Sequence, residues 1–329
     1  MPKRSSRTLE RRGGLIDLDD FAQHTADWVE PLRARYRECD ILEMPPSTQG
    51  FVALQMLNVL EGFDMRGMGH NSADALHLIA EAKKLAFADR GAYLADRQAM
   101  TPGLIGTLVS KAYADERRSA IDLGVAREYA PGLGHDGGRT PGFAGRDLGD
   151  TVYLTVADDR GNVVSLIQSL FAAFGAGIVA GDTGITLHNR GSGFTLAPGH
   201  ANCIAPRKRP LHTLVPAMLL KDGRPWVSFG VMGGDNQAQA HAQVVVNLVD
   251  HAMDIQQAGE AARVRHLGDS LAVESGIETD VQTALRARGH ALSDGRGQMG
   301  GFQGILIDPV SGVLSGGSDP RKDGAAIGY

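Results

Sequence analysis

Apolar positions in the first third of the chain recur every three or four residues, which is the spacing of an amphipathic helix. The clearest stripe lies within residues 72–97 and consists of Ala75, Ile79, Ala82, Leu85 and Ala86. Ser72 stands just before this stripe, and serine is a favoured residue at the N-cap position. The pattern therefore predicts a long helix that begins after Ser72.

Three further segments of this region have helical spacing of their apolar residues. They are residues 15–32, with a cap near Asp17; residues 44–63, with a stop at Gly62; and residues 110–123. The N-terminal part of the chain is therefore predicted to be mainly helical.

The pattern changes at residues 127–150, which are rich in Gly, Pro and Asp and predict a long loop. Beyond them the predicted strands are residues 151–157, 162–168, 185–188, 213–220 and 226–231, with short strands around 271–274 and 304–309. Turn sequences at 158–162 and 221–224 predict two hairpins. Further helices are predicted over 236–253 and 254–265. This order of elements favours an α+β fold with antiparallel sheets over a parallel βαβ fold.

The composition narrows the possible partners and locations. The 329 residues carry a net charge of -5, which gives no reason to expect nucleic acid or a membrane as a partner. Residues 1–12 are basic and polar and predict a solvated tail, with no apolar region of a secretory signal. The expected location is the cytoplasm by default, or the periplasm or exterior if the true N-terminus is missing. The two cysteines, Cys39 and Cys203, make no disulfide framework.

Most of the usual chemical motifs are absent from the sequence. The histidines are scattered and none has metal-ligand spacing with a cysteine or another histidine, so we expect no metal and no cofactor. The Gly-rich segments match neither a dinucleotide fingerprint nor a P-loop, and no GxSxG nucleophile elbow occurs. Gly233 and Gly234 follow a predicted strand and precede a helix. They form either a simple tight turn or an oxyanion hole of backbone N–H groups.

Thr151 opens the first predicted hairpin directly after Gly149 and Asp150. Threonine is a good strand former, and this alone accounts for its presence. A threonine hydroxyl is also a nucleophile when a base activates it, and an N-terminal amine supplies such a base. The residues leave these two interpretations open.

Six stretches, taken together and in order, resemble the gamma-glutamyltranspeptidase family of N-terminal-nucleophile hydrolases. They are "MPPSTQGFVALQMLNVLEG", "SADALHLIAEAKKLAFADR", "DTVYLTVADDRGNVVSLIQS", "FGAGIVAGDTGITLHNR", "APRKRPLHTLVPAMLLKDGRP" and "SDPRKDGAAIGY". The resemblance runs from residue 13 to the C-terminus. It implies a four-layer αββα sandwich that is incomplete in this chain.

The resemblance also implies roles for individual residues. The precursor would cut itself between Asp150 and Thr151, and Thr151 would become both nucleophile and N-terminus. Ser169 matches a hydroxyl that supports the nucleophile. Gly233 and Gly234 match the oxyanion-hole pair. The implied activity is acyl transfer from an amide to water or an amine, as in glutathione hydrolases, acylases or oxamate amidohydrolases.

The residues that match the family's substrate-binding positions depart from the gamma-glutamyl pattern. Phe171 occupies a position where the family has Asn, and Arg190 one where it has Gln. Gly193 replaces the Asp that pairs an α-ammonium. A Ser-Ser pair of the family is replaced by His212 and Thr213. We therefore expect a poor glutathione hydrolase, closer to the acylase-like or oxamate-amidohydrolase-like branches. Arg190 would either bind a substrate carboxylate or form a structural ion pair.

The resemblance divides the chain into a tail at 1–12, the C-terminal part of the large-subunit region at 13–150 and the small-subunit region at 151–329. The family's N-terminal half is not represented. We expect either a separate chain that supplies it or, alternatively, a truncated, non-catalytic remnant or scaffold. The other expected partner is a small-molecule amide substrate.

Overall fold

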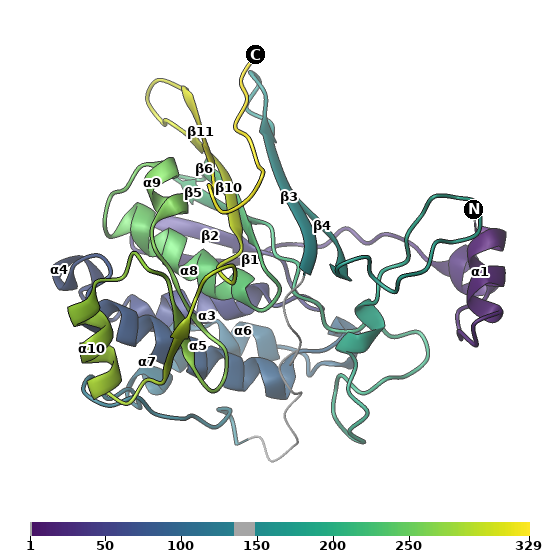
Figure 1. Cartoon of the computed structure of the whole chain (residues 1–329), viewed down its shortest axis with the longest axis horizontal. Helices are drawn as coiled ribbons and strands as arrows, with labels where there is room; N and C mark the ends of the chain where they lie inside the picture. The colour runs from purple at the N-terminus through teal and green to yellow at the C-terminus, as the bar shows by residue number, and fades with distance from the viewer. Residues whose placement is uncertain (1, 135–148) are drawn as a thin grey trace.

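A six-stranded sheet forms the centre of the computed structural model, which describes residues 2–134 and 149–329 (Figure 1). Every pair of neighbouring strands in this sheet is antiparallel. In spatial order the strands are β1 (Leu32–Tyr36), β2 (Cys39–Glu43), β5 (Ala217–Lys221), β6 (Arg224–Met232), β10 (Gly301–Ile307) and β11 (Leu314–Ser318).

A two-stranded ribbon lies against one face of the central sheet, along β6 and β10 (Figure 1). It is the hairpin of β3 (Gly149–Ala157) and β4 (Val163–Ala172). A small third sheet contains β7 (Val264–His266), β8 (Leu271–Val273) and β9 (Leu292–Asp294), of which β8 and β9 are parallel.

Helices cover the other face of the central sheet. Of these, α3 packs on β1 and β2, α8 packs on β6, and α5 lies against both helices. The α-helices are α1 (Pro2–Glu10), α2 (Leu18–Gln23), α3 (Gly50–Leu60), α4 (Met65–Met68), α5 (Ala73–Tyr93), α6 (Leu104–Leu108), α7 (Lys111–Arg118), α8 (Asn236–Val249), α9 (Ile255–Glu260) and α10 (Thr279–Ala287). None of the helices in the described ranges is long and apolar enough to cross a membrane.

The residues of β6 show how the layers are held together. Side chains alternate between the two faces of a strand. Phe229 faces α8, where its ring lies 4.9 Å from that of His241. Ser228 and Gly230 face the ribbon, and Gly230 leaves room for the Tyr153 ring, which a Cβ at this position would overlap. The sequence of β6 thus suits a strand buried between two layers.

The outer face of the ribbon is apolar and open to solvent. Its side chains are 41–50% exposed, and they are Val152, Leu154, Val156, Val164 and Leu166. Three layers of the expected four-layer sandwich are therefore present: the helices, the central sheet and the ribbon. None of the described residues covers the face on which a fourth layer would pack.

The sequence-based predictions of the main elements are confirmed. The antiparallel α+β architecture is present, α5 begins after Ser72 as its N-cap, and Asp17 caps α2 with a capping box. The helical prediction over 15–32 is too long, because only Leu18–Gln23 is helical and β1 begins at Leu32.

Other predictions need correction. Residues 2–10 form the helix α1, although all of its side chains except that of Ser5 remain partly or fully exposed. No strand forms at 185–188, where only an isolated bridge between Val179 and Thr186 occurs. Most of the predicted loop, residues 135–148, lies outside the described residues.

Candidate active site

Thr151 and Ser169 face each other across the first ladder of the ribbon. The two residues are paired in the β3–β4 register, and the Thr151 Oγ1 donates a hydrogen bond of 2.9 Å to the Ser169 Oγ. The Ser169 Oγ also accepts the backbone N–H of Phe171 at 2.8 Å. The register of the ladder shifts between Asp150 and Thr151. A half-buried hydroxyl pair therefore lies near the start of β3, next to a backbone irregularity.

The ribbon crosses the central sheet in a regular way that carries Thr151 toward the Gly-Gly turn. The Thr155 Oγ1 donates to the Ser228 Oγ at 2.7 Å, and the Tyr153 ring covers Gly230. Each step of two residues along β3 is thus matched by a step of two in the opposite direction along β6. The two strands therefore run in opposite directions, and the end of β3 that contains Thr151 points toward the end of β6 that leads to Gly233.

The turn at Gly233 and Gly234 presents backbone N–H groups. Both glycines have positive φ, of 134° and 57°, a region that other residues rarely adopt. Their carbonyl oxygens accept the amides of Asn236 (2.9 Å) and Gln237 (3.2 Å) at the start of α8. Because the C=O and N–H of a peptide unit point in opposite directions, the amides of Gly234 and Asp235 point away from the helix. Such amides at a helix N-terminus can hold a developing oxyanion.

Arg190, Phe171 and Thr213 come together as the sequence suggested. The Arg190 Nη1 donates to the Thr213 Oγ1 at 3.1 Å, and its Cζ lies 4.6 Å from the centre of the Phe171 ring. Phe171 itself has a φ of 78°, a strained conformation for this residue. The three residues belong to different segments of the chain, so the fold alone assembles them.

The guanidinium of Arg190 is buried and only partly satisfied. Its side chain is 7% exposed, and neither the Nε nor the Nη2 has a hydrogen-bond partner among residues 2–134 and 149–329. Burial lowers the pKa of Arg190 to about 10, so the group stays charged at neutral pH. Within that part of the chain no carboxylate forms an ion pair with it, and the alternative of a structural ion pair finds no partner there.

Gly193 and His212 lie beside this group. The Gly193 carbonyl accepts the side-chain amide of Asn202 at 2.7 Å. Burial, and then the charges of Arg190 and Arg209, lower the pKa of His212 to about 4, so this imidazole is neutral at pH 7. Gly193 has no side chain, so the loss of gamma-glutamyl recognition stays a prediction.

Two polar residues near the turn were missed by the sequence analysis. Gln49 precedes α3, and its Nε2 donates to the carbonyl oxygens of Gly234 (3.1 Å) and Thr213 (3.2 Å). Arg90 on α5 forms a 2.7 Å ion pair with Asp235, the residue after the turn. The one available signal was a glutamine at the N-cap position, where Ser, Thr, Asp or Asn is usual.

The structure also assembles a group that the sequence did not suggest. His77, Glu81 and His290 are buried, and their possible ligand atoms lie within 4.8 Å of one another. These atoms already have partners: His77 bonds to His290 (2.9 Å) and to a backbone carbonyl oxygen, while Glu81 bonds to Lys84 (2.7 Å) and Tyr129 (2.6 Å). The group is therefore satisfied as a hydrogen-bond network.

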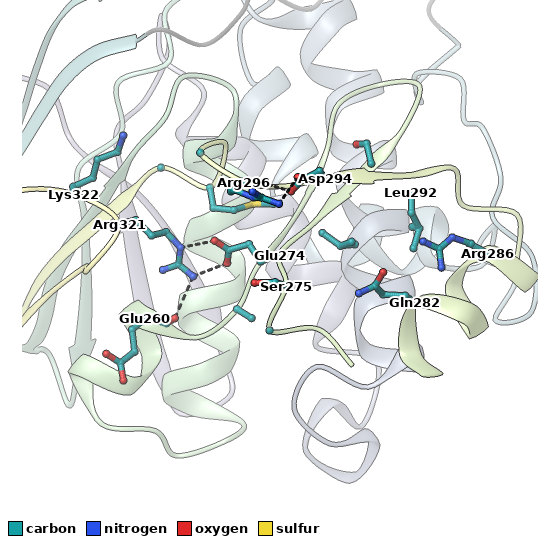
Figure 2. A pocket seen from close by; sticks show the side chains of 17 residues that line it. Glu260, Glu274, Ser275, Gln282, Arg286, Leu292, Asp294, Arg296, Arg321 and Lys322 are labelled. Carbon is teal, nitrogen blue, oxygen red and sulfur yellow. Dashed lines mark hydrogen bonds and ion pairs between the residues drawn. The ribbon is translucent and has the colours of Figure 1, made fainter. Parts of the chain in front are cut away.

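A pocket of about 700 Å³ lies near the turn, between the small third sheet, α10 and the C-terminal segment (Figure 2). Figure 2 shows Arg321 paired with Glu274, and Arg296 paired with Asp294, at 2.6 and 3.2 Å. Gly300 belongs to the lining, and its Cα would lie 3.2 Å from a Cβ on Gly233. None of the expected site residues lines this pocket.

A sequence model of the family described as "Gamma-glutamyltranspeptidase" matches residues 3–329. The chain belongs to the gamma-glutamyltranspeptidase family. The resemblance inferred from the six sequence stretches is thereby confirmed.

Similar proteins agree with this assignment. The Acylase ACY 1 proenzyme of Pseudomonas sp. (strain SE83) is 40% identical over 320 residues, covering 97% of this chain and 55% of that protein. The crystal structure of cephalosporin acylase from Bacillus halodurans has a TM-score of 0.89 and 36% identity, over 100% of this chain and 59% of that chain. Both relatives are named as enzymes. The chain spans a little over half the length of each.

A third match concerns a shorter chain. A solved chain of gamma-glutamyltranspeptidase from Pseudomonas nitroreducens has a TM-score of 0.50 and 27% identity, over 54% of this chain and 98% of that chain. The Pseudomonas sp. acylase is named as a proenzyme, and the solved Pseudomonas nitroreducens chain matches only 54% of the present chain. The expected N-terminal-nucleophile fold is confirmed by these structural neighbours.

Proposed function

We propose that this chain is the nucleophile-bearing part of an autoprocessing amidohydrolase or acyltransferase in which Thr151 is the nucleophile. The observation that carries the proposal is the 2.9 Å hydrogen bond between the Thr151 and Ser169 hydroxyls at the start of β3. Thr151 is the half-buried third residue of β3, so a new N-terminus there would release only Gly149 and Asp150 from their pairing with β4.

In the proposed self-cleavage, the Thr151 Oγ attacks the carbonyl carbon of Asp150. An ester bond to the Oγ forms, the peptide C–N bond breaks, and the released nitrogen takes up the hydroxyl proton. Water then hydrolyses the ester, leaving a carboxylate on Asp150 and a free α-amine on Thr151. Ser169 orients the attacking oxygen through their hydrogen bond.

The same groups perform acyl transfer on a substrate. The α-amine of Thr151 accepts the proton of the hydroxyl as the Oγ attacks the substrate's amide carbonyl, and the proton then passes to the leaving amine. Backbone N–H groups of the Gly233–Gly234 turn stabilise the oxyanion. Water or a second amine takes the acyl group from the Oγ and restores the enzyme.

Arg190 indicates the kind of acyl group. Its buried guanidinium keeps two nitrogens free among the described residues, and a substrate carboxylate would satisfy both in a forked hydrogen-bond pair. With Gly193 at the position of the ammonium-pairing acid, the preferred acyl part carries a carboxylate and no α-ammonium. Oxamate and glutaryl amides are examples.

The division of the chain is supported by length. The solved Pseudomonas nitroreducens chain is matched by 54% of these 329 residues, about 178, and residues 151–329 number 179. We propose that residues 13–150 belong to the large subunit and residues 151–329 form the small subunit, with the cut between Asp150 and Thr151.

The proposal includes a further segment that completes the sandwich. The outer face of the ribbon leaves Val152, Leu154 and Val156 between 42% and 50% exposed. A contiguous apolar face of this kind is unusual on a free surface. Because the chain spans just over half of its relatives, we infer that the missing N-terminal half covers this face, on the same or a separate polypeptide.

The test is mass spectrometry of this chain together with the segment that completes the sandwich, here called the two-part protein, and of its Thr151→Ala variant. We expect the wild type to yield a fragment that begins at Thr151, and the variant to remain intact and inactive. Thr155→Ala is the matched control, because it removes a hydroxyl from the same strand while leaving Thr151 in place, and it should still cleave. A fragment beginning at residue 151 in the Thr151→Ala variant would refute the assignment.

The alternative function is a non-catalytic remnant or scaffold, and the uncovered ribbon face is the observation that favours it. It predicts that the wild-type chain stays intact even when the completing segment is present. An intact chain with no fragment beginning at Thr151 in that mass spectrum would therefore decide for the scaffold.

A further inference from the structure

Gln49 connects two parts of the site that are far apart in the sequence. It is fully buried at the start of α3, and its Nε2 lies 3.1 Å from the carbonyl oxygen of Gly234 and 3.2 Å from that of Thr213. Gly234 belongs to the turn expected to hold the oxyanion, and Thr213 binds Arg190 through its hydroxyl. A single side chain thus ties the turn to the acyl-binding segment.

The orientation of the Gln49 amide follows from its neighbours. Both nearby atoms are carbonyl oxygens, which accept hydrogen bonds and cannot donate them. The opposite orientation would place the Oε1 against two acceptors, so the Nε2 must face them. The Oε1 has no hydrogen-bond partner among the described residues. Among the described residues, the hydrogen bonds of the Gln49 side chain therefore go to these two carbonyl oxygens.

Gln49 is also unusual for its position in the chain. It is the N-cap residue of α3, yet its side chain makes no hydrogen bond to the first turn of that helix. The usual capping residues stabilise a helix by such a bond. Here the long side chain reaches instead to a turn that lies 185 residues further along the chain.

The contact has a direct effect on the geometry of the turn. Glycines lack a side chain that restricts their backbone, so the peptide unit between Gly234 and Asp235 needs an external restraint to hold one orientation. The Gly234 carbonyl oxygen accepts the backbone amide of Gln237 in α8 at 3.2 Å and the Gln49 side-chain amide at 3.1 Å. Fixing this oxygen fixes the peptide unit that follows Gly234, and with it the backbone conformation of Gly234 in the turn.

We propose that Gln49 is a positioning residue that holds the Gly233–Gly234 turn in the orientation needed to stabilise the oxyanion, and that couples this turn to Thr213. This inference rests on the proposed function. Gln49 contacts neither the nucleophile nor the substrate, and it acts through the backbone of the two segments that do.

The test uses the two-part protein with Gln49→Met, which keeps the length of the side chain and removes both donors. We expect kcat to fall by about 10- to 100-fold, with KM changed less than about threefold, because removing an oxyanion donor outright costs about 10²–10³-fold. Self-cleavage should slow by a similar factor, since it needs the same stabilised oxyanion.

Gln55→Met is the matched control. Gln55 lies on the same helix, is 5% exposed and donates to Asp89 at 3.0 Å, away from the turn. Its substitution measures the cost of losing a buried amide from α3. We expect kcat and self-cleavage to be unchanged in this variant.

Gln49→Leu is the second variant, and it tests the proposal if Gln49→Met fails to fold. Leucine has no polar hydrogen to donate to either carbonyl, so kcat should fall at least as far as in Gln49→Met. Unchanged kcat in a cleaved Gln49 variant, or an equal loss in Gln55→Met, would overturn the positioning role. A wild-type protein that neither cleaves itself nor hydrolyses any donor would overturn this role together with the proposed function.

Discussion

Replacing Arg190 by methionine should change stability and specificity in opposite directions. Burial lowers the pKa of Arg190 from its usual 12.5 to about 10, which corresponds to about 3 kcal/mol of penalty on the charged form in the folded state. Because the folded pKa is the lower one, this penalty is present at every pH below about 10. The hydrogen bond to Thr213 and the contact with Phe171 offset part of it. Arg190→Met should therefore raise the stability of the free protein by about 1–2 kcal/mol, a rise in Tm of roughly 2–5 °C.

The same substitution should remove the preference for a carboxylate on the acyl group. Truncating one partner of a buried charge pair costs about 2–5 kcal/mol, or roughly 30-fold to several thousand-fold in kcat/KM. A glutaryl anilide should lose this factor, whereas a valeryl anilide, which has the same chain length without the carboxylate, should lose little. In the wild type, glutaryl should also be preferred over gamma-glutamyl, because no acid at Gly193 pairs the ammonium.

The assay measures Tm without substrate, and kcat/KM for the three anilides, on processed samples of the wild type and of two variants. Arg190→Lys is the control, since it keeps the charge but loses the planar fork and should retain part of the preference. A lower Tm in Arg190→Met, or an equal loss for glutaryl and valeryl donors, would refute the reasoning. A clear wild-type preference for the gamma-glutamyl donor would refute the substrate assignment.

Two further predictions concern the turn and the helix behind it. Gly234→Val, at a φ of 57° that valine rarely adopts, should lower turnover by about 10²-fold or more, and unchanged turnover in a processed sample would remove this turn from the mechanism. Burial lowers the pKa of Lys83 from 10.5 to about 7. Between these two pH values the unfolded chain binds more protons than the folded one, so the contribution of Lys83 to the free energy of unfolding rises with pH. The gain in Tm of Lys83→Met over the wild type should therefore be largest at or below about pH 7 and shrink toward about pH 10, and a gain that does not vary with pH would contradict this.

The elements that the sequence predicts best are those with local signals. The helix α5 follows from the N-cap serine at Ser72 and a continuous apolar stripe, and both lie within the segment itself. The hairpin of β3 and β4 follows from the turn between them, where the Asp158 carboxylate binds the amides of Arg160 and Asn162. Local sequence is sufficient where the interactions are local.

Other elements depend on distant partners. The strands β1 and β2 are short and partly charged, and β2 forms its second ladder with β5, about 180 residues further along the chain. In α8 the buried side chains of Gln239 and Gln243 bind backbone groups of His266 and Val264. In the sequence these glutamines look like surface residues, because the strand β7 whose backbone they bind lies outside the helix itself.

The same distinction applies to the candidate site. Pairing across one hairpin, together with family resemblance, was enough to suggest that Thr151 and Ser169 meet. Arg190 was identified as unusual, but only the structure shows that its guanidinium lacks a carboxylate among the described residues. Gln49 was not identified, because both of its contacts lie more than 160 residues away.

The contacts between β3 and β6 determine where residues can be inserted into the hairpin without displacing Thr151. Thr155 on Ser228 and Tyr153 on Gly230 hold the strand against the sheet in steps of two residues. A single residue inserted between Tyr153 and Thr151 would turn the threonine to the opposite face, because side chains alternate along a strand. Two inserted residues would restore the face but move the hydroxyl by roughly 7 Å along the strand. An epitope or affinity tag placed in the exposed turn 158–162 would leave this spacing intact.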